Sequence, residues 1–330
     1  MISDALNLDN PVFSEPYMST PDVSHFHAIS VNAPVSTLVE GYIHDSIAEA
    51  TRRAYLFDLA QFERWGGRIP CEPNDLAAYL AECAATLAVA TLVRRVAAIA
   101  RAHHARGVPS PTRAEVVRAT LRGIRRRCGT AQREARPLLR DELFRTLDAI
   151  GDSAKDARDR ALLLIGFAAG FRRSELVGLD VPDIEIVPQG LVIHLRRSKT
   201  DQDGAGRKIG VPFGRTRFCP VTALGLWRER SGITEGPLFR PVARNGRIAT
   251  TRLSGEAISV IVKARVAAAG YDPTRYSGHS LRAGLATSAA QAGVALWRIR
   301  KQTGHASDAM LARYIRAGEL FIDNAAGALL

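Results

Sequence analysis

The sequence predicts a mainly α-helical fold of two domains with one small antiparallel β-sheet. The chain has 330 residues, which is more than one hydrophobic core usually organises. Apolar residues recur at helical spacing along most of the chain. The exception is the stretch of residues 191–213, where two strand-like runs flank a polar, turn-forming segment, as in a β-hairpin.

Composition indicates a soluble globular protein, because 46% of the residues are hydrophobic and 24% are charged. The longest apolar run, residues 161–171, is too short to cross a bilayer and predicts a buried helix. The chain starts without a basic, then apolar, export signal, so we expect a cytoplasmic protein. No CxxC pair or Cys/His cluster occurs, which predicts reduced thiols and no zinc site for four cysteines: Cys71, Cys83, Cys128 and Cys219.

The N-terminal part of the chain divides into a tail and a helical domain. Prolines and polar residues fill residues 1–35, which predicts a flexible tail. Residues 36–130 follow a helical pattern throughout. One helix carries a predicted buried stripe of apolar residues at helical spacing: Tyr55, Leu59, Phe62 and Trp65. Further helices are predicted at residues 75–84 (with Asn74 as N-cap), 91–106 and 112–128.

The charge indicates a polyanionic partner. Lys and Arg number 45 against 33 Asp and Glu, which gives a net charge of +12. Nucleic acid is the commonest partner of so basic a protein, and arginine suits forked contacts to phosphate. A solvated helix face is the alternative explanation for the arginine run in the predicted helix 112–128. The candidate DNA contacts are Arg52, Arg53, Arg118, Arg122, Arg125 and Arg126.

A second domain is predicted after a linker. Residues 129–136 are polar and basic and precede a proline, so we expect the second domain to cover residues 137–330. An amphipathic segment, residues 319–330, closes the chain. The predicted strands are residues 191–197 and 207–213, and the predicted helices are residues 140–150, 154–171, 221–230, 255–269, 281–293, 296–303 and 308–315.

Phosphodiester transfer without a metal requires three kinds of group. Cationic forks stabilise the negative charge of the transition state, a hydroxyl attacks phosphorus, and a general acid protonates the departing oxygen. Arg172, in the run GFRRSEL, lies between an apolar helix and the start of a short helix, where anions are favoured. An ion pair with Glu175 on a surface turn explains Arg172 equally well.

Four further residues could supply the remaining groups. His279 and Arg282, in GHSLR, are three residues apart, so both lie on one helix face and could meet one phosphate. His305 follows a helix-ending glycine, and Tyr314 comes nine residues later. Taken singly, such residues have commoner explanations, since most tyrosines of this kind are half-buried aromatics. Lys199, at the end of a strand, could likewise be an ordinary solvated lysine.

The order of these residues is more informative than any one of them. In the local contexts GFRRSEL, SKT, GHSLR, TGH and RYI, the set reads Arg172, Lys199, His279, Arg282, His305 and Tyr314. Over residues 137–318 this pattern resembles the tyrosine recombinase (phage-integrase) family, which includes Cre, lambda integrase and the Xer proteins. Residues 36–130 are also similar to that family's helical, SAM-like core-binding domain.

The resemblance implies a role for each matching position. Arg172 and Arg282 would clamp the scissile phosphate. Tyr314 would attack it, leaving a 3′-phosphotyrosine and a free 5′-hydroxyl. Lys199 would protonate the leaving oxygen, and Lys208 on the opposite strand is its rival for this role.

The remaining positions would assist this chemistry. His279 would help proton transfer at the nucleophile and hold the phosphate, and His305 would donate a hydrogen bond to a non-bridging oxygen. Glu175 would orient its neighbours. The resemblance implies that no metal or other cofactor takes part.

At the level of the whole protein, the resemblance implies a two-domain, C-shaped clamp on double-stranded DNA. It also implies a homotetramer that exchanges strands through a Holliday junction, with residues 319–330 docking on a neighbouring protomer; packing within one protomer is the alternative for this segment. The short tail favours a simple recombinase acting on short inverted repeats. Two other functions stay open: a type IB topoisomerase, and a DNA-binding regulator without catalysis.

Overall fold

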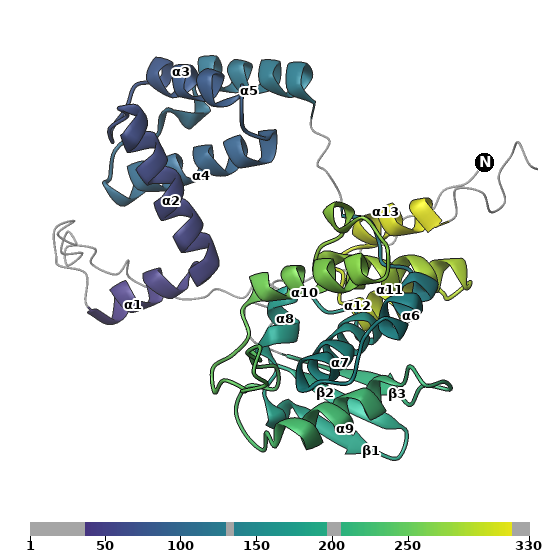
Figure 1. Cartoon of the computed structure of the whole chain (residues 1–330). Helices are drawn as coiled ribbons and strands as arrows, with labels where there is room; N and C mark the ends of the chain where they lie inside the picture. The colour runs from purple at the N-terminus through teal and green to yellow at the C-terminus, as the bar shows by residue number, and fades with distance from the viewer. Residues whose placement is uncertain (1–36, 130–134, 197–205, 319–330) are drawn as a thin grey trace, which may run out of the picture. The chain divides into compact units, whose positions relative to one another are not determined.

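The chain separates into two compact units, residues 1–132 and 133–330 (Figure 1). The computed structural model describes residues 37–129, 135–196 and 206–318. The predicted tail and the predicted C-terminal segment, residues 319–330, therefore lie outside the described residues. The mainly helical fold class with one small antiparallel sheet is confirmed.

The first unit is helical, as predicted. Phe62 is fully buried and meets the ring of Tyr79 edge-on at 4.9 Å between ring centroids. Leu59 and Trp65 pack against the same core. Tyr55 does not join this core, because it lines a separate groove on the side of α1 and α4. The helices are α1 (Thr37–Asp45), α2 (Glu49–Trp65), α3 (Pro73–Cys83), α4 (Val89–Ala105) and α5 (Glu115–Cys128).

Two predicted helix starts in this unit are wrong. The helix α3 begins at Pro73, and Asn74 lies inside it instead of capping it. Proline is favoured at the first helical position, where its missing N–H has no partner to lose. The helix α5 begins at Glu115, because a separate 3-10 turn, Pro111–Arg113, precedes it.

The second unit contains the sheet and the remaining helices. None of the described helices in either unit combines the length and the apolar character needed to cross a membrane. Figure 1 shows the sheet and α9 at one end of the unit and α11 to α13 at the other. The helices are α6 (Arg140–Asp148), α7 (Ala154–Ala168), α8 (Arg173–Gly178), α9 (Pro220–Ser231), α10 (Gly255–Ala268), α11 (His279–Gln291), α12 (Leu296–Thr303) and α13 (Asp308–Gly318).

The sheet has three antiparallel strands in the order β1–β2–β3. The predicted hairpin is confirmed as β2 (Gly190–Leu195) and β3 (Arg207–Pro212), in a register that pairs Leu195 with Arg207. The first strand, β1 (Ile184–Val187), was not predicted. It has four residues, of which the middle two are exposed, so its sequence lacks the alternation that marks a half-buried strand.

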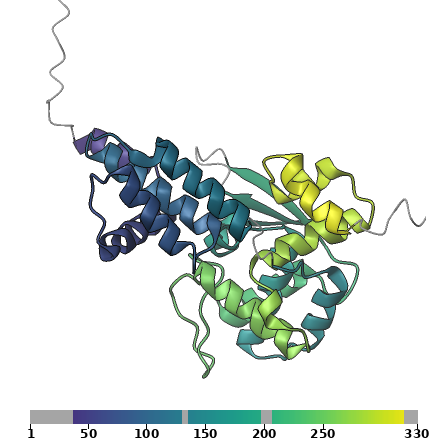
Figure 2. The ribbon, with the colours of Figure 1, turned by 90° about the horizontal axis from the view of Figure 1, so that it is seen from above.

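The core of the second unit is built around α7. Nine of the residues from Ala157 to Gly166 are buried, and α7 packs against both α9 and α11. The helix ends at Ala168, earlier than predicted, so Phe171 and Arg172 belong to the connection into α8. The helices α11, α12 and α13 contact one another, and Figure 2 shows the two C-terminal helices in yellow gathered at one side of the unit.

The segment that enters the second unit lies directly on α11. The backbone N–H of Arg136 donates to the Arg275 carbonyl at 2.7 Å, and that of Leu138 donates to the Ser280 carbonyl at 2.9 Å. A Cβ at Gly284 would overlap the carbonyl of Leu138. Glycine at this position is therefore what permits the backbone of the segment to contact the helix.

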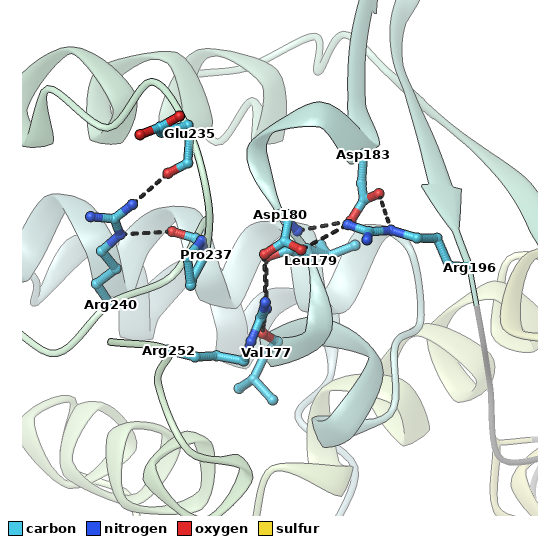
Figure 3. Close-up of polar contacts among 9 residues, drawn as sticks. All are labelled: Val177, Leu179, Asp180, Asp183, Arg196, Glu235, Pro237, Arg240 and Arg252. Atoms are coloured by element: carbon cyan, nitrogen blue, oxygen red, sulfur yellow. Dashed lines mark hydrogen bonds and ion pairs between the residues drawn. The ribbon is translucent and has the colours of Figure 1, made fainter. Parts of the chain in front are cut away.

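A network of charged residues fixes the end of β2 (Figure 3). The guanidinium of Arg196 binds both carboxylate oxygens of Asp183 at 2.7 Å and one of Asp180 at 2.8 Å. These two carboxylates raise the pKa of Arg196 above its ordinary value. Arg252 binds the other oxygen of Asp180 at 2.5 Å and the Val177 carbonyl at 2.6 Å. The end of β2 is thereby tied to the loop that follows α8.

Candidate active site

Arg172 is held by Glu175 from two directions. Its backbone N–H donates to Oε2 of Glu175 at 2.9 Å, and its Nη1 donates to Oε1 at 2.6 Å. The Glu175 side chain is 1% exposed. The expected alternative, an ion pair, is thus present, but it is buried instead of lying on a surface turn. Nη2 of Arg172 donates to the Gly304 carbonyl at 3.3 Å, so Arg172 also reaches the end of α12.

Arg282 is a buried cation, and one of its N–H donors has no hydrogen-bond partner among the described residues. The residue is 1% exposed. Its Nη1 donates to the Gly170 carbonyl at 2.8 Å and to the Thr303 carbonyl. Its Nη2 is buried and has no hydrogen-bond partner among the described residues. Burial, followed by the charge of Arg172, lowers the pKa of Arg282 to about 10. A buried cationic donor without a partner is costly, and an anion placed beside it would remove that cost.

His305 is buried beside these arginines. Its Nδ1 lies 2.7 Å from Oγ1 of Thr303, which in turn donates to the Ile299 carbonyl at 2.7 Å. The threonine hydroxyl has one proton, so this geometry favours a proton on Nδ1 of His305 and a lone pair on Nε2. Burial, Arg282 and Arg172 lower the pKa of His305 to about 3, which makes the ring neutral.

Tyr314 and His279 meet across two helices. The hydroxyl of Tyr314, on α13, lies 2.5 Å from Nε2 of His279 at the start of α11. The ring of His305 lies 5.6 Å from that of Tyr314, measured between centroids. One pocket opens onto the five predicted catalytic residues that the structure describes, and its lining consists of Arg172, His279, Arg282, His305, Ala309, Met310 and Tyr314.

The structure describes only one of the two candidate lysines. Lys199 lies outside the described residues. Lys208 is on β3, opposite His194, and its side chain is exposed. Side chains alternate along a strand, so Lys208 faces away from the side of β3 that carries Arg207 and the buried Ile209.

Arg207 reaches the site although the sequence analysis assigned it no role. Its Nη1 donates to the carbonyls of Lys301 and Gln302 at 3.2 and 2.9 Å, and its Nη2 donates to that of Thr303 at 3.3 Å. The sequence did carry a usable signal. Arg207 shares the buried face of its strand with two apolar residues, and an arginine there must find acceptors in the interior.

The predicted arginines of the first unit lie at its surface. On α5, the side chains of Arg118 and Arg122 are 61% and 49% exposed, and both approach Glu115. Arg122 is the larger cause of the lowered pKa of Glu115. Positions 118, 122, 125 and 126 share one face of a helix, and Arg125 and Arg126 are exposed as well. On α2, Arg52 and Arg53 approach Glu49 at 2.8 and 3.7 Å.

Among the described residues, no group of three or more His, Cys, Asp or Glu side chains is placed to hold a metal ion. The four cysteines form no disulfide.

Comparison with known proteins gives consistent results. The family model described as "Phage integrase family" matches residues 136–319. The chain is 37% identical over 307 residues to an integrase/recombinase XerD homolog of Selenomonas ruminantium, with 90% of each chain covered. It is 30% identical over 281 residues to recombinase Cre of Escherichia phage P1, with 79% of each covered. A crystal structure of a lambda integrase fragment, a dimer bound to a COC′ core site, has the same fold, with a TM-score of 0.61 at 19% identity over 84% of this chain and 92% of that one.

Proposed function

Because the chain belongs to the phage integrase family and is a site-specific tyrosine recombinase, we propose that Tyr314 cleaves DNA through a covalent 3′-phosphotyrosine intermediate. The observation that carries this proposal is the pocket that is lined both by Tyr314 and by a buried arginine, Arg282, whose Nη2 has no partner among the described residues. A nucleophile and an anion-binding group open into one space, as phosphoryl transfer requires.

The bonds and protons of the cleavage step balance without a metal. The Tyr314 oxygen forms a bond to phosphorus, and the bond from phosphorus to the 5′ oxygen breaks. The phenolic proton passes to Nε2 of His279, which is 2.5 Å away. The leaving 5′ oxygen takes a proton from Lys199. Attack of a 5′-hydroxyl on the phosphotyrosine reverses these steps and joins the new strand.

The cations of the pocket stabilise the transition state. Arg172 and Arg282 bind the non-bridging oxygens, and Glu175 keeps Arg172 in place through its two hydrogen bonds. His305 is neutral before DNA binds, since burial and then the nearby arginines lower its pKa. A bound phosphate brings negative charge to the pocket and favours the protonated ring. His305 then donates a hydrogen bond from Nε2.

The general acid is Lys199 in this proposal. Its rival Lys208 projects from the exposed side of β3, away from Arg207 and the carbonyls that end α12. That orientation supports Lys199, which lies in the connection between β2 and β3.

The proposal extends to the assembly on DNA. The helical unit, over residues 36–130, serves as a core-binding domain that contacts backbone phosphates through the exposed arginines of α5, and residues 137–330 form the catalytic domain. Together they clamp double-stranded DNA at the nucleoid. Four protomers exchange strands through a Holliday junction, and residues 319–330 dock on a neighbouring protomer. Family membership and the net charge of +12 support this arrangement.

A suicide-substrate assay tests the proposal. The protein would be incubated in EDTA with nicked duplexes taken from the DNA that flanks its gene, beside the variant Tyr314→Phe. We expect a covalent protein–DNA band from the wild type alone, with equal DNA binding by both proteins. Specific binding by both proteins without an adduct from either would contradict the proposal and favour a DNA-binding regulator.

Plasmid relaxation separates recombination from topoisomerase activity. A type IB topoisomerase would relax a supercoiled plasmid that lacks the specific site, whereas we expect the recombinase to require the site. Rapid site-independent relaxation would contradict this part of the proposal.

A further inference from the structure

We propose that Arg207 is a positioning residue of the recombinase, which holds the turn of residues 301–304 so that Arg172, Arg282 and His305 meet the phosphate. This inference rests on the proposed function and adds to it a residue outside the pocket. Arg207 does not line the pocket, so its effect must pass through the residues that it binds.

Arg207 donates its hydrogen bonds to backbone carbonyls at the end of α12. Its guanidinium binds three successive carbonyls at the C-terminal end of α12, at 2.9 to 3.3 Å. The last carbonyls of a helix have no partner within the helix and carry the negative end of its dipole. Among the described residues, no carboxylate lies within ion-pair distance of Arg207. Its hydrogen bonds therefore go to backbone carbonyls, and Glu175 opposes its charge from beyond ion-pair distance.

The second support is that the same turn binds both proposed phosphate clamps. Arg282 donates to the carbonyl of Thr303, and Arg172 donates to that of Gly304. Arg207 shares the Thr303 carbonyl with Arg282. His305 follows this turn directly. A shift of the turn would thus move three of the proposed catalytic groups together.

The third support is the close packing of Arg207 against the turn. Gly304 has a φ of +66°, and a Cβ there would lie 2.8 Å from Cζ of Arg207. A larger residue would push the guanidinium away from its carbonyls. Gly304 therefore serves Arg207 in two ways: it adopts the left-handed conformation of the turn, and its missing side chain leaves space for the guanidinium.

The charge of Arg207 adds to the field in the pocket. It is among the cations that lower the pKa of both Arg282 and His305. Burial lowers the pKa of Arg207 itself. Removing this charge leaves the ion pairs among the described residues intact but makes the pocket less attractive to a phosphate.

A role limited to the hairpin is the competing explanation. Arg207 begins β3, so it could act only by fastening the hairpin and thereby placing Lys199. Arg196 is a matched control, because it ends the neighbouring strand and is bound to Asp180 and Asp183 instead of α12. The two arginines hold the same hairpin from different sides.

The test compares Arg207→Met, Arg207→Lys and Arg196→Met in single-turnover cleavage at saturating protein. Two substrates would be used: the normal phosphodiester, and one with sulfur at the 5′ bridging position. A thiolate leaves without help from an acid, because thiols are much more acidic than alcohols. DNA affinity and Tm would be measured for every variant, to exclude unfolding.

We expect Arg207→Met to cleave both substrates about 10- to 100-fold more slowly than the wild type, a smaller loss than follows when a group that itself contacts the transition state is removed. Arg207→Lys should recover most of the rate, since it keeps the charge. Arg196→Met should match the wild type on the sulfur substrate. Wild-type cleavage of the sulfur substrate by Arg207→Met would overturn the inference and leave Arg207 a role in the hairpin alone.

An NMR titration of His305 tests the role of Arg207 independently of DNA cleavage. The pKa of His305 would be followed by NMR in the DNA-free protein, and we expect it to rise in Arg207→Met while Arg196→Met leaves it unchanged. If the wild type forms no adduct, the proposed function fails, and this titration still decides the inference. An unchanged pKa of His305 in Arg207→Met would overturn it.

Discussion

The hydroxyl of Tyr314 lies 2.5 Å from Nε2 of His279, although the two residues are 35 positions apart and belong to different helices. The contact depends on the packing of α13 against α11. It pairs a phenol with a group able to take its proton, which is how a weak hydroxyl nucleophile is activated.

The proton acceptor can be tested by replacing His279 with glutamine. Glutamine keeps a hydrogen-bonding group but cannot take the proton. We expect His279→Gln to slow single-turnover cleavage by roughly 10²- to 10⁴-fold, the usual contribution of general acid–base catalysis, with little change in DNA affinity. A loss below about threefold would show that another base accepts the proton.

Arg282 should stabilise the transition state of cleavage while lowering the stability of the folded protein. It is buried, its Nη2 has no partner among the described residues, and its contacts are carbonyls rather than a carboxylate. We expect Arg282→Met to abolish cleavage while leaving the free energy of unfolding equal or about 1–3 kcal/mol higher, as when other buried charges are replaced by apolar residues. Denaturant unfolding measures this change. A large destabilisation would show that Arg282 holds the fold together.

His305 should make stability depend on pH. Its pKa is about 3 in the folded protein and 6.5 in the reference state, so the unfolded chain binds the proton more readily. The stabilisation is complete above about pH 6.5 and is lost as the pH falls toward 3. From about pH 7 to about pH 5, the wild type should lose roughly 2 kcal/mol more than His305→Gln. Parallel unfolding curves for the two proteins at both pH values would contradict this.

The roles of Lys199 and Lys208 can be distinguished with two substrates whose leaving groups differ in acidity. We expect Lys199→Ala to cleave the normal phosphodiester at least about 100-fold more slowly and to recover on a substrate with 5′ bridging sulfur. Lys208→Ala is the control and should behave as the wild type on both. If Lys208→Ala instead cleaves the phosphodiester slowly and the sulfur substrate at the normal rate, the general acid is Lys208.

Gly284 should tolerate no side chain. A Cβ at this position would overlap the Leu138 carbonyl, which is backbone and cannot rotate away. We expect Gly284→Ala to lower the free energy of unfolding by about 2 kcal/mol or more, because either α11 or the segment on it must shift. Gly225, on α9, has open space beside it and provides the control as Gly225→Ala. Equal Tm values for the two variants would contradict the prediction.

Most of the helices and five residues of the pocket could be predicted from sequence. Helical periodicity marked α7 and α12, and the order of motifs indicated that Arg172 and Tyr314 belong to one site. The missing strand β1 was too short and too exposed to show a pattern. Arg207 was missed for a different reason. Its partners are backbone carbonyls almost 100 residues away, and carbonyls have no sequence signature.

The segment that enters the second unit is hydrogen-bonded to α11 through Leu138. The connecting chain reaches the second unit on the very helix that bears His279 and Arg282. A displacement of residues 136–138 would therefore reach this helix directly, through the hydrogen bond from the Leu138 N–H to the Ser280 carbonyl.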